Sequence, residues 1–139
     1  MKINIREVSR VSENKLGRIR TNGMQKMAHE YATASYLTLF GVNIDFLKQT
    51  NTVGTHNADF MIFGTIWESK SPDGRSKNAI ERNIKNSGHQ AENLVLDLRR
   101  FGMKGDQSEA EAIKQFTLSR NTRRMLLITK DGRLLDIKK

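Results

Sequence analysis

The sequence predicts an α/β (α+β) fold in which helices cover a mixed β-sheet. Three observations support this fold class. Residues 24–40 carry apolar side chains at roughly helical spacing, and residues 57–70 have the alternating pattern of a β-hairpin. Residues 77–98 indicate a helix followed by an apolar strand. Because a strand precedes that helix, we expect a strand–helix–strand crossover, which joins strands in parallel.

We expect the elements in the order helix, three strands, helix, strand, helix and two strands. Gly41 supplies a C-terminal stop for the first helix. Ser108, followed three residues later by Glu111, forms a capping-box pattern before the last helix. The Asp-Gly turn in "KDGR" closes the final hairpin. The expected strands span 42–47, two parts of 57–70, 93–98, 124–129 and 134–137, and the expected helices span 24–40, 77–88 and 108–119.

The length of 139 residues fits one domain. Residues 1–23 are basic and polar without clear periodicity, so we expect a basic arm or linker there and a single domain over 24–139. The chain has no cysteine, which excludes disulfides, thiolate zinc sites and cysteine nucleophiles. No apolar run approaches the roughly 20 residues that a membrane-spanning helix needs. We therefore expect no membrane contact and a cytoplasmic site of action.

The charge of the chain predicts a polyanionic partner. Lys and Arg number 24 against 15 Asp and Glu, which gives a formal net charge of +9. Nucleic acid is the first candidate for such a partner. Small basic proteins can also be merely soluble, so the charge by itself leaves the class of partner open.

Three charged residues, Asp59, Glu68 and Lys70, interrupt the apolar hairpin region "NADFMIFGTIWESK". If Phe63 and Gly64 form the centre of the turn, Asp59 lies opposite Glu68. Two carboxylates at that separation repel each other unless a proton or a cation lies between them. Lys70 follows Glu68 by two residues, so the strand period places both on one face.

This face suits metal-assisted phosphodiester hydrolysis. Asp59 and Glu68 would hold Mg²⁺ or Mn²⁺, with Zn²⁺ as a further candidate, and Lys70 would orient a water molecule or offset developing charge. The alternative is structural. In that case the three side chains line the solvent side of an edge hairpin, with Glu68 and Lys70 as a surface ion pair of little energetic value.

A second polar segment, "DGRSKN" at 73–78, precedes a predicted helix. Backbone N–H groups and basic side chains could grip a phosphate there, because a helix N-terminus attracts anions. The alternative is a polar turn in which Ser76 or Asn78 caps the helix. The candidate nucleic-acid-binding residues are Arg75, Ser76, Lys77, Asn78 and Arg82.

The Asp, then Glu-x-Lys arrangement in "NADFMIFGTIWESK" resembles the PD-(D/E)XK nuclease superfamily, with "NAD" in place of the usual Pro-Asp. The longer block "ADFMIFGTIWESKSPDGRSKNAIERNIKNSGHQAENLVLDLRR" resembles the C-terminal tRNase domains of CdiA-type contact-dependent growth inhibition toxins and related phage-borne proteins. The resemblance extends from about residue 30 to the C-terminus. It implies a PD-(D/E)XK-like core and a nuclease domain over 24–139.

The resemblance also implies a function and further site residues. The domain would be a metal-dependent endonuclease that cleaves tRNA, delivered as the C-terminal part of a secreted or surface-exposed toxin and bound by a cognate immunity protein. Glu30 would help to bind or position the metal, and Gln90 would join the site in a less defined role. A DNase of the same fold and a non-catalytic nucleic-acid-binding module remain alternatives, because the sequence shows no reader of the 2′-OH. The implied catalytic set is Glu30, Asp59, Glu68, Lys70 and Gln90, with Asp59, Glu68 and Glu30 as metal ligands.

Overall fold

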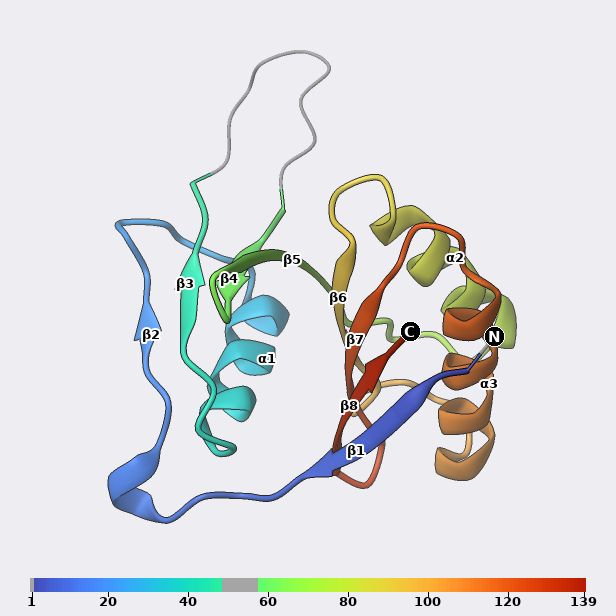
Figure 1. Ribbon diagram of the computed structural model, residues 1–139, viewed down its shortest axis with the longest axis horizontal. Coiled ribbons are helices and arrows are strands. Elements are labelled where there is room, and N and C mark those ends of the chain that lie inside the picture. Colours follow the sequence, from blue (N-terminus) through green and yellow to red (C-terminus); the bar gives the residue numbers. More distant parts are fainter. Residues whose placement is uncertain (1, 49–57) are drawn as a thin grey trace.

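A computed structural model describes residues 2–48 and 58–139 and shows a mixed eight-stranded sheet with helices on both faces (Figure 1). The strand order is β1-β8-β7-β6-β5-β4-β3-β2. Within the described residues, no helix combines the length and apolarity needed to cross a membrane. The elements are β1 (Asn4–Val8), the 3₁₀ helix η1 (Glu13–Lys15), β2 (Ile19–Arg20), α1 (Ala28–Thr38), β3 (Ile44–Phe46), β4 (Phe60–Ile62), β5 (Thr65–Lys70), α2 (Lys77–Ser87), β6 (Asn93–Asp97), α3 (Gly105–Leu118), β7 (Arg124–Ile128) and β8 (Leu134–Lys138).

The predicted fold class is confirmed, and from α1 to β8 the order of elements agrees with the prediction. Two predicted helix starts are wrong, because α1 begins at Ala28 instead of residue 24, and α3 begins at Gly105, so that Ser108 lies inside the helix. The Ser108 hydroxyl donates to the Gly105 carbonyl at 3.0 Å. A serine inside a helix can satisfy its hydroxyl by donating to a carbonyl of the preceding turn, so Ser108 does not have to be the N-cap residue.

The sheet separates two apolar cores, because successive side chains of a strand point to opposite faces. On one face, Leu37 and Phe40 of the α1 segment pack with Trp67 and Val95. On the other face, α2 and α3 cover the alternate positions of β6, among them Leu94. Strands β5, β6 and β7 pair in parallel, so α2 and α3 are crossover helices, and Figure 1 shows both on the same side of the sheet.

Residues 1–23 differ from the expected arm or linker. β1 pairs antiparallel with β8, and β2 pairs parallel with β3, so this segment contributes a strand to each edge of the sheet (Figure 1). Between these strands, the N–H of Val11 donates to the Leu39 carbonyl at 3.0 Å and the N–H of Gly17 to the Thr38 carbonyl at 2.8 Å. Carbonyls at a helix C-terminus lack partners within the helix. The segment therefore supplies hydrogen bonds that α1 needs.

This packing predicts that Gly17→Ala destabilises the fold. A Cβ atom at Gly17 would lie 1.8 Å from the Val42 carbonyl oxygen, so the backbone would have to move. We expect a loss of about 1–3 kcal/mol in the free energy of unfolding, measured by urea denaturation. Gly74→Ala is the control, because a Cβ there meets nothing within 4 Å. Equal losses from the two substitutions would show that residues 9–18 do not pack as described.

A buried carboxylate, Asp136 on β8, ties β8 to β7. Arg124 donates to it through Nε at 3.0 Å and Nη2 at 2.8 Å, and Arg6 Nη2 lies 3.4 Å away. Burial alone would raise the pKa of Asp136, but hydrogen bonding from Arg124 and nearby positive charges outweigh it, and the pKa is lowered. The Arg124 guanidinium lies over the ring of Phe63, at 4.7 Å from its centroid. Asp136 thus orients the Arg124 guanidinium against Phe63, at the tip of the β4–β5 hairpin.

We expect Asp136→Asn to lower the free energy of unfolding at pH 7 by about 2 kcal/mol, because it weakens charge-assisted hydrogen bonds. A depressed pKa contributes stability above the unfolded value of about 3.9 that is lost as the pH falls through the folded pKa. The difference between wild type and variant should therefore shrink below about pH 4. Urea denaturation at pH 7 and below about pH 4 measures this difference. Asp73→Asn, in an exposed ion pair with Arg100, is the control and should have little effect. A difference independent of pH would contradict this account.

Candidate active site

The β4–β5 hairpin has the predicted two-residue turn. Phe63 and Gly64 have φ angles of 54° and 78°, the left-handed region that a tight hairpin turn requires. This conformation costs a non-glycine residue about 1–2 kcal/mol, and the Phe63 ring lies edge-on to Trp67 with centroids 6.2 Å apart. The regular register ends one residue short of Asp59, whose N–H donates to the Trp67 carbonyl at 3.0 Å. The paired residues are Ile62 with Thr65, Met61 with Ile66, and Phe60 with Trp67.

Glu68 and Lys70 lie on the α2 face of the sheet. They pair with Leu94 and Leu96, whose side chains belong to the α2–α3 core, whereas Trp67 belongs to the α1 core. Glu68 is only 4% exposed. The shared face of Glu68 and Lys70 agrees with the strand period, but the alternative of a solvent-exposed ion pair is wrong for Glu68.

Asp59 and Glu68 converge on one backbone donor. The N–H of Ser69 donates to Asp59 Oδ2 at 2.9 Å and to Glu68 Oε1 at 3.1 Å. Burial, together with a hydrogen bond and the negative charge from Asp59, raises the pKa of Glu68 to about 8, while Lys70 and the Ser69 N–H act in the opposite direction. A proton or a cation would relieve the repulsion between two carboxylates held this close.

Gln90 reaches the same carboxylate from the segment after α2. With its amide nitrogen turned toward Glu68, it donates to Glu68 Oε2 at 3.2 Å and to the Asn86 carbonyl at 2.6 Å. The two oxygens of Glu68 thus have different partners, Ser69 and Gln90. This arrangement fixes the orientation of the carboxylate and brings Gln90 into the site.

Glu30 reaches Asp59 from the first turn of α1 and shares a hydrogen bond with it, and a lysine contacts both carboxylates. Lys26 Nζ is 3.7 Å from Glu30 Oε2 and 3.6 Å from Asp59 Oδ1. Burial and then the charge of Asp59 raise the pKa of Glu30, and Lys26 partly opposes this. Lys26 was not predicted from the sequence. The available signal was its spacing of four residues from Glu30, which is typical of side-chain pairs on a helix.

The donor chemistry of the site suits a hard cation only in part. Among residues 2–48 and 58–139, no group of three or more His, Asp or Glu side chains is placed to hold a metal ion. The adjacent oxygens of Asp59 and Glu68 match the ligands that Mg²⁺ and Mn²⁺ prefer. Glu30 shares a hydrogen bond with Asp59, and the Lys26 ammonium group contacts both carboxylates, so a positive charge already occupies this part of the site. The three-carboxylate ligand set therefore stays a prediction.

Four of the predicted nucleic-acid-binding residues, Arg75 to Asn78, lie at the start of α2, and Arg82 lies in the middle of this helix. Ser76 Oγ accepts from the Asn78 N–H at 3.3 Å, which makes Ser76 the N-cap of α2. Arg75, Lys77 and Arg82 are exposed. Because α2 runs back between two parallel strands, its first turn lies toward the Lys70 end of β5 and its last turn toward the beginning of β5. The structure thus places Arg75 and Lys77 at the end of α2 opposite to Gln90, with Arg82 midway along the helix.

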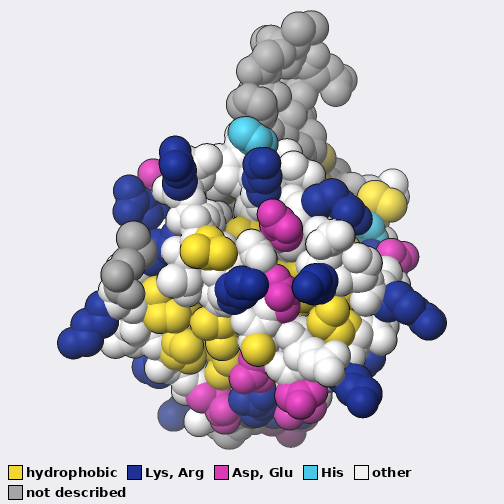
Figure 2. All heavy atoms as spheres, turned by 90° about the vertical axis from the view of Figure 1, so that its right-hand side faces the viewer, with side chains coloured by type: hydrophobic (Ala, Val, Ile, Leu, Met, Phe, Trp, Pro, Cys, Tyr) yellow, Lys and Arg dark blue, Asp and Glu magenta, His cyan; other side chains and the backbone are white. Residues whose placement is uncertain are grey.

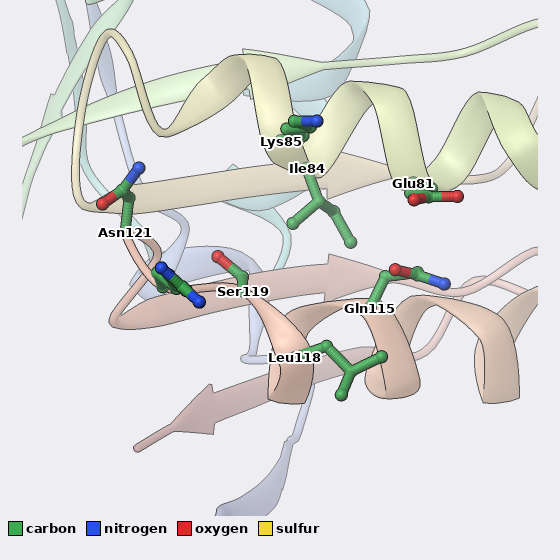
Figure 3. Close-up of a pocket in the computed structure, with 8 residues that line it drawn as sticks. Glu81, Ile84, Lys85, Gln115, Leu118, Ser119 and Asn121 are labelled. Carbon is green, nitrogen blue, oxygen red and sulfur yellow. The ribbon is translucent and has the colours of Figure 1, made fainter.

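The surface near the site is basic and hollowed. Figure 2, which shows the side of the molecule bearing α2 and α3, has Lys and Arg side chains spread over most of that face. A groove of about 490 Å³ borders Gln90, His89 and Ile66. A separate pocket of about 330 Å³ opens between α2 and the end of α3 (Figure 3) and includes none of the predicted site residues. The groove therefore adjoins the site through Gln90, and none of the site's carboxylates lines it.

Comparisons with known proteins agree with this fold. A comparison with curated proteins finds no match. Among solved structures, a chain of the "CdiA-CT/CdiI toxin and immunity complex from Burkholderia pseudomallei" is similar, with a TM-score of 0.67 and 20% identity over 88% of this chain and 100% of that chain. The family model for the contact-dependent growth inhibition CdiA C-terminal domain matches residues 56–134, more than half of the chain, and this range includes Asp59, Glu68, Lys70 and Gln90. The chain therefore belongs to the family of CdiA C-terminal domains, the toxin domains of contact-dependent growth inhibition.

Proposed function

We propose that this toxin domain is a divalent-metal-dependent nuclease of the PD-(D/E)XK type that cleaves tRNA. The observation that supports it best is the convergence of Asp59 and Glu68 on the Ser69 N–H, with Lys70 on the same face of β5 as Glu68. The net charge of +9 supports a polyanionic substrate.

Each residue of the site has a role in this proposal. Asp59 and Glu68 would hold Mg²⁺ or Mn²⁺, and Glu30 would complete the ligand set. A bound cation of this kind polarises a phosphate and acidifies a water molecule. Gln90 and the Ser69 N–H hold the Glu68 carboxylate in place, so its oxygens are aimed before substrate arrives. Lys70 offsets the negative charge that develops on the phosphate.

Substrate binding in this proposal depends on charge rather than on base reading. Arg75 and Lys77 at the start of α2 and Arg82 in its middle are exposed and would contact phosphates, which positions a nucleic acid without specifying its sequence. Ser76 and Asn78 contribute the helix cap that holds this turn. The groove beside Gln90 leaves room for substrate next to Glu68.

A cognate immunity protein is the proposed protein partner. The similar structure from Burkholderia pseudomallei is described as a complex of a toxin and its immunity protein. Since tRNA is abundant in the cytoplasm, the domain would act there after delivery, and a bound immunity protein would keep it from tRNA in the producing cell.

Incubation of the purified domain with total tRNA and with plasmid DNA, in Mg²⁺ and in EDTA, tests the activity. We expect cleavage of tRNA in Mg²⁺, no cleavage in EDTA and an intact plasmid, because all proposed ligands are oxygen donors. Cleavage of plasmid but not tRNA would favour a DNase. Full activity in EDTA would rule out the metal requirement, and salt-dependent binding without cleavage would favour a binding module.

Asp59→Asn, Glu68→Gln and Lys70→Ala should each lower the cleavage rate by at least about 10²-fold, because each removes a charge at the reacting phosphate. None of the three residues is a member of the two apolar clusters, so circular dichroism and thermal melting should show that the fold is kept. Asp73→Asn, an exposed carboxylate in the loop after β5, is the matched control. Activity retained in any two of the three variants would refute the assignment of the site.

Replacement of Arg75, Lys77 and Arg82 by Ala should weaken tRNA binding and raise KM, with a smaller change in kcat. The salt dependence of the affinity should also fall, by about 0.7–0.9 units of log–log slope for each phosphate that the variant no longer neutralises. Filter binding at several salt concentrations measures both effects. The control replaces the exposed Lys2, Lys15 and Lys138, which removes the same charge elsewhere. Equal losses in the two triple variants would mean that the start of α2 is not a specific contact surface.

A further inference from the structure

A lysine side chain is buried inside the carboxylate site. The Lys26 side chain is 4% exposed, against 17% for Glu30 and 16% for Asp59. Its ammonium group is within 3.7 Å of one oxygen on each carboxylate and 5.9 Å from the ring centroids of Phe46 and Phe60. Two anions and two aromatic faces therefore offset the cost of burying this charge.

We infer that Lys26 is an internal counter-cation of the site, which holds Glu30 and Asp59 together in the absence of a divalent cation and withdraws when one binds. The metal step of this inference rests on the proposed function. Lys26 lies outside the residues that the family model matches, and no sequence motif identifies it. It is a positioning residue, since it acts on the carboxylates rather than on a substrate.

Displacement follows from the space between the two carboxylates. The Lys26 ammonium contacts both Glu30 Oε2 and Asp59 Oδ1, so a cation that uses these two oxygens would lie directly against it. Mg²⁺ needs ligand distances of about 2.0–2.1 Å, shorter than either ammonium contact. Two positive charges in so small a space also repel each other. Ammonium and divalent cation therefore compete for the same carboxylates.

The segment that carries Lys26 can release the side chain without breaking a helix or strand. Lys26 lies between β2 and α1, outside both elements. The preceding turn includes Asn22 and Gly23 with φ angles of 52° and 75°, and the Met24 N–H donates to the Thr21 carbonyl at 2.9 Å. The flexible stem of a lysine can then move its charged end into solvent while the backbone stays in place.

Lys26→Met tests the inference, because methionine keeps the apolar stem and removes the charge. We expect the Kd for Mn²⁺, measured by titration calorimetry, to fall about tenfold, or ~1.4 kcal/mol. In EDTA, the melting temperature should fall, because Glu30 and Asp59 lose their counter-charge, and Mn²⁺ should raise it more than in wild type. Lys114→Met removes an exposed lysine of α3 and is the matched control. Lys26→Arg keeps the charge, so it should not tighten Mn²⁺ binding.

The outcomes separate this inference from the proposed function. Wild-type binding of Mn²⁺ with unchanged or weaker binding by Lys26→Met would overturn the inference alone, because Lys26 would then be a fixed partner of the ligands. No Mn²⁺ binding by wild type or variant would overturn the metal-dependent function as well. If Lys26→Met does not fold in EDTA, recovery of its circular dichroism spectrum with Mn²⁺ supports the inference, and failure to recover overturns it.

Discussion

The two-residue turn at Phe63 and Gly64 determines which face of the sheet receives Glu68 and Lys70. A shift of one residue in the register would turn both charges into the α1 core and move Trp67 to the α2 face. Trp67 opposes such a shift, because its indole N–H donates to the Ile62 carbonyl at 3.0 Å and its ring is fully buried. Arg124 adds to this by lying over the Phe63 and Trp67 rings. The strained φ angle at Phe63 is therefore held by the packing of its neighbours.

The position of the hairpin has an electrostatic cost, because it largely buries the carboxylates of Asp59 and Glu68. Glu68 is nearly inaccessible to solvent and shares one N–H with Asp59, so neither carboxylate is fully solvated. Gln90 supplies a neutral donor and Lys26 supplies a charge, and both come from segments outside the hairpin. Since unsatisfied buried charges strongly destabilise a fold, these contacts allow the largely buried acidic pair to persist without being replaced by apolar side chains.

Sequence periodicity was sufficient to predict the structure where that structure depends on local patterns. The order of elements from α1 onward, the turn at Phe63 and Gly64 and the shared face of Glu68 and Lys70 were all predictable, because each depends on residues close in the chain. β1 was missed because its side chains are largely exposed and so show no apolar alternation. Lys26 was missed because its contact with Asp59 depends on tertiary packing. Glu30 and Gln90 entered only through the resemblance, since a lone polar residue on a helix, such as Glu30, or just after one, such as Gln90, is ordinarily solvated.

The site joins two parts of the chain that both contribute strands to the sheet. Asp59, Glu68, Lys70 and Gln90 belong to the part that the family model matches, whereas Lys26 and Glu30 precede it. The earlier part is held by the β2–β3 pairing and by Asn22, whose side-chain amide donates to the Phe46 carbonyl at 3.0 Å. These contacts place the beginning of α1 beside β3 and β4. The contact between Lys26 and Asp59 therefore depends on the packing of the edge strand β2 as much as on the β4–β5 hairpin that carries Glu68.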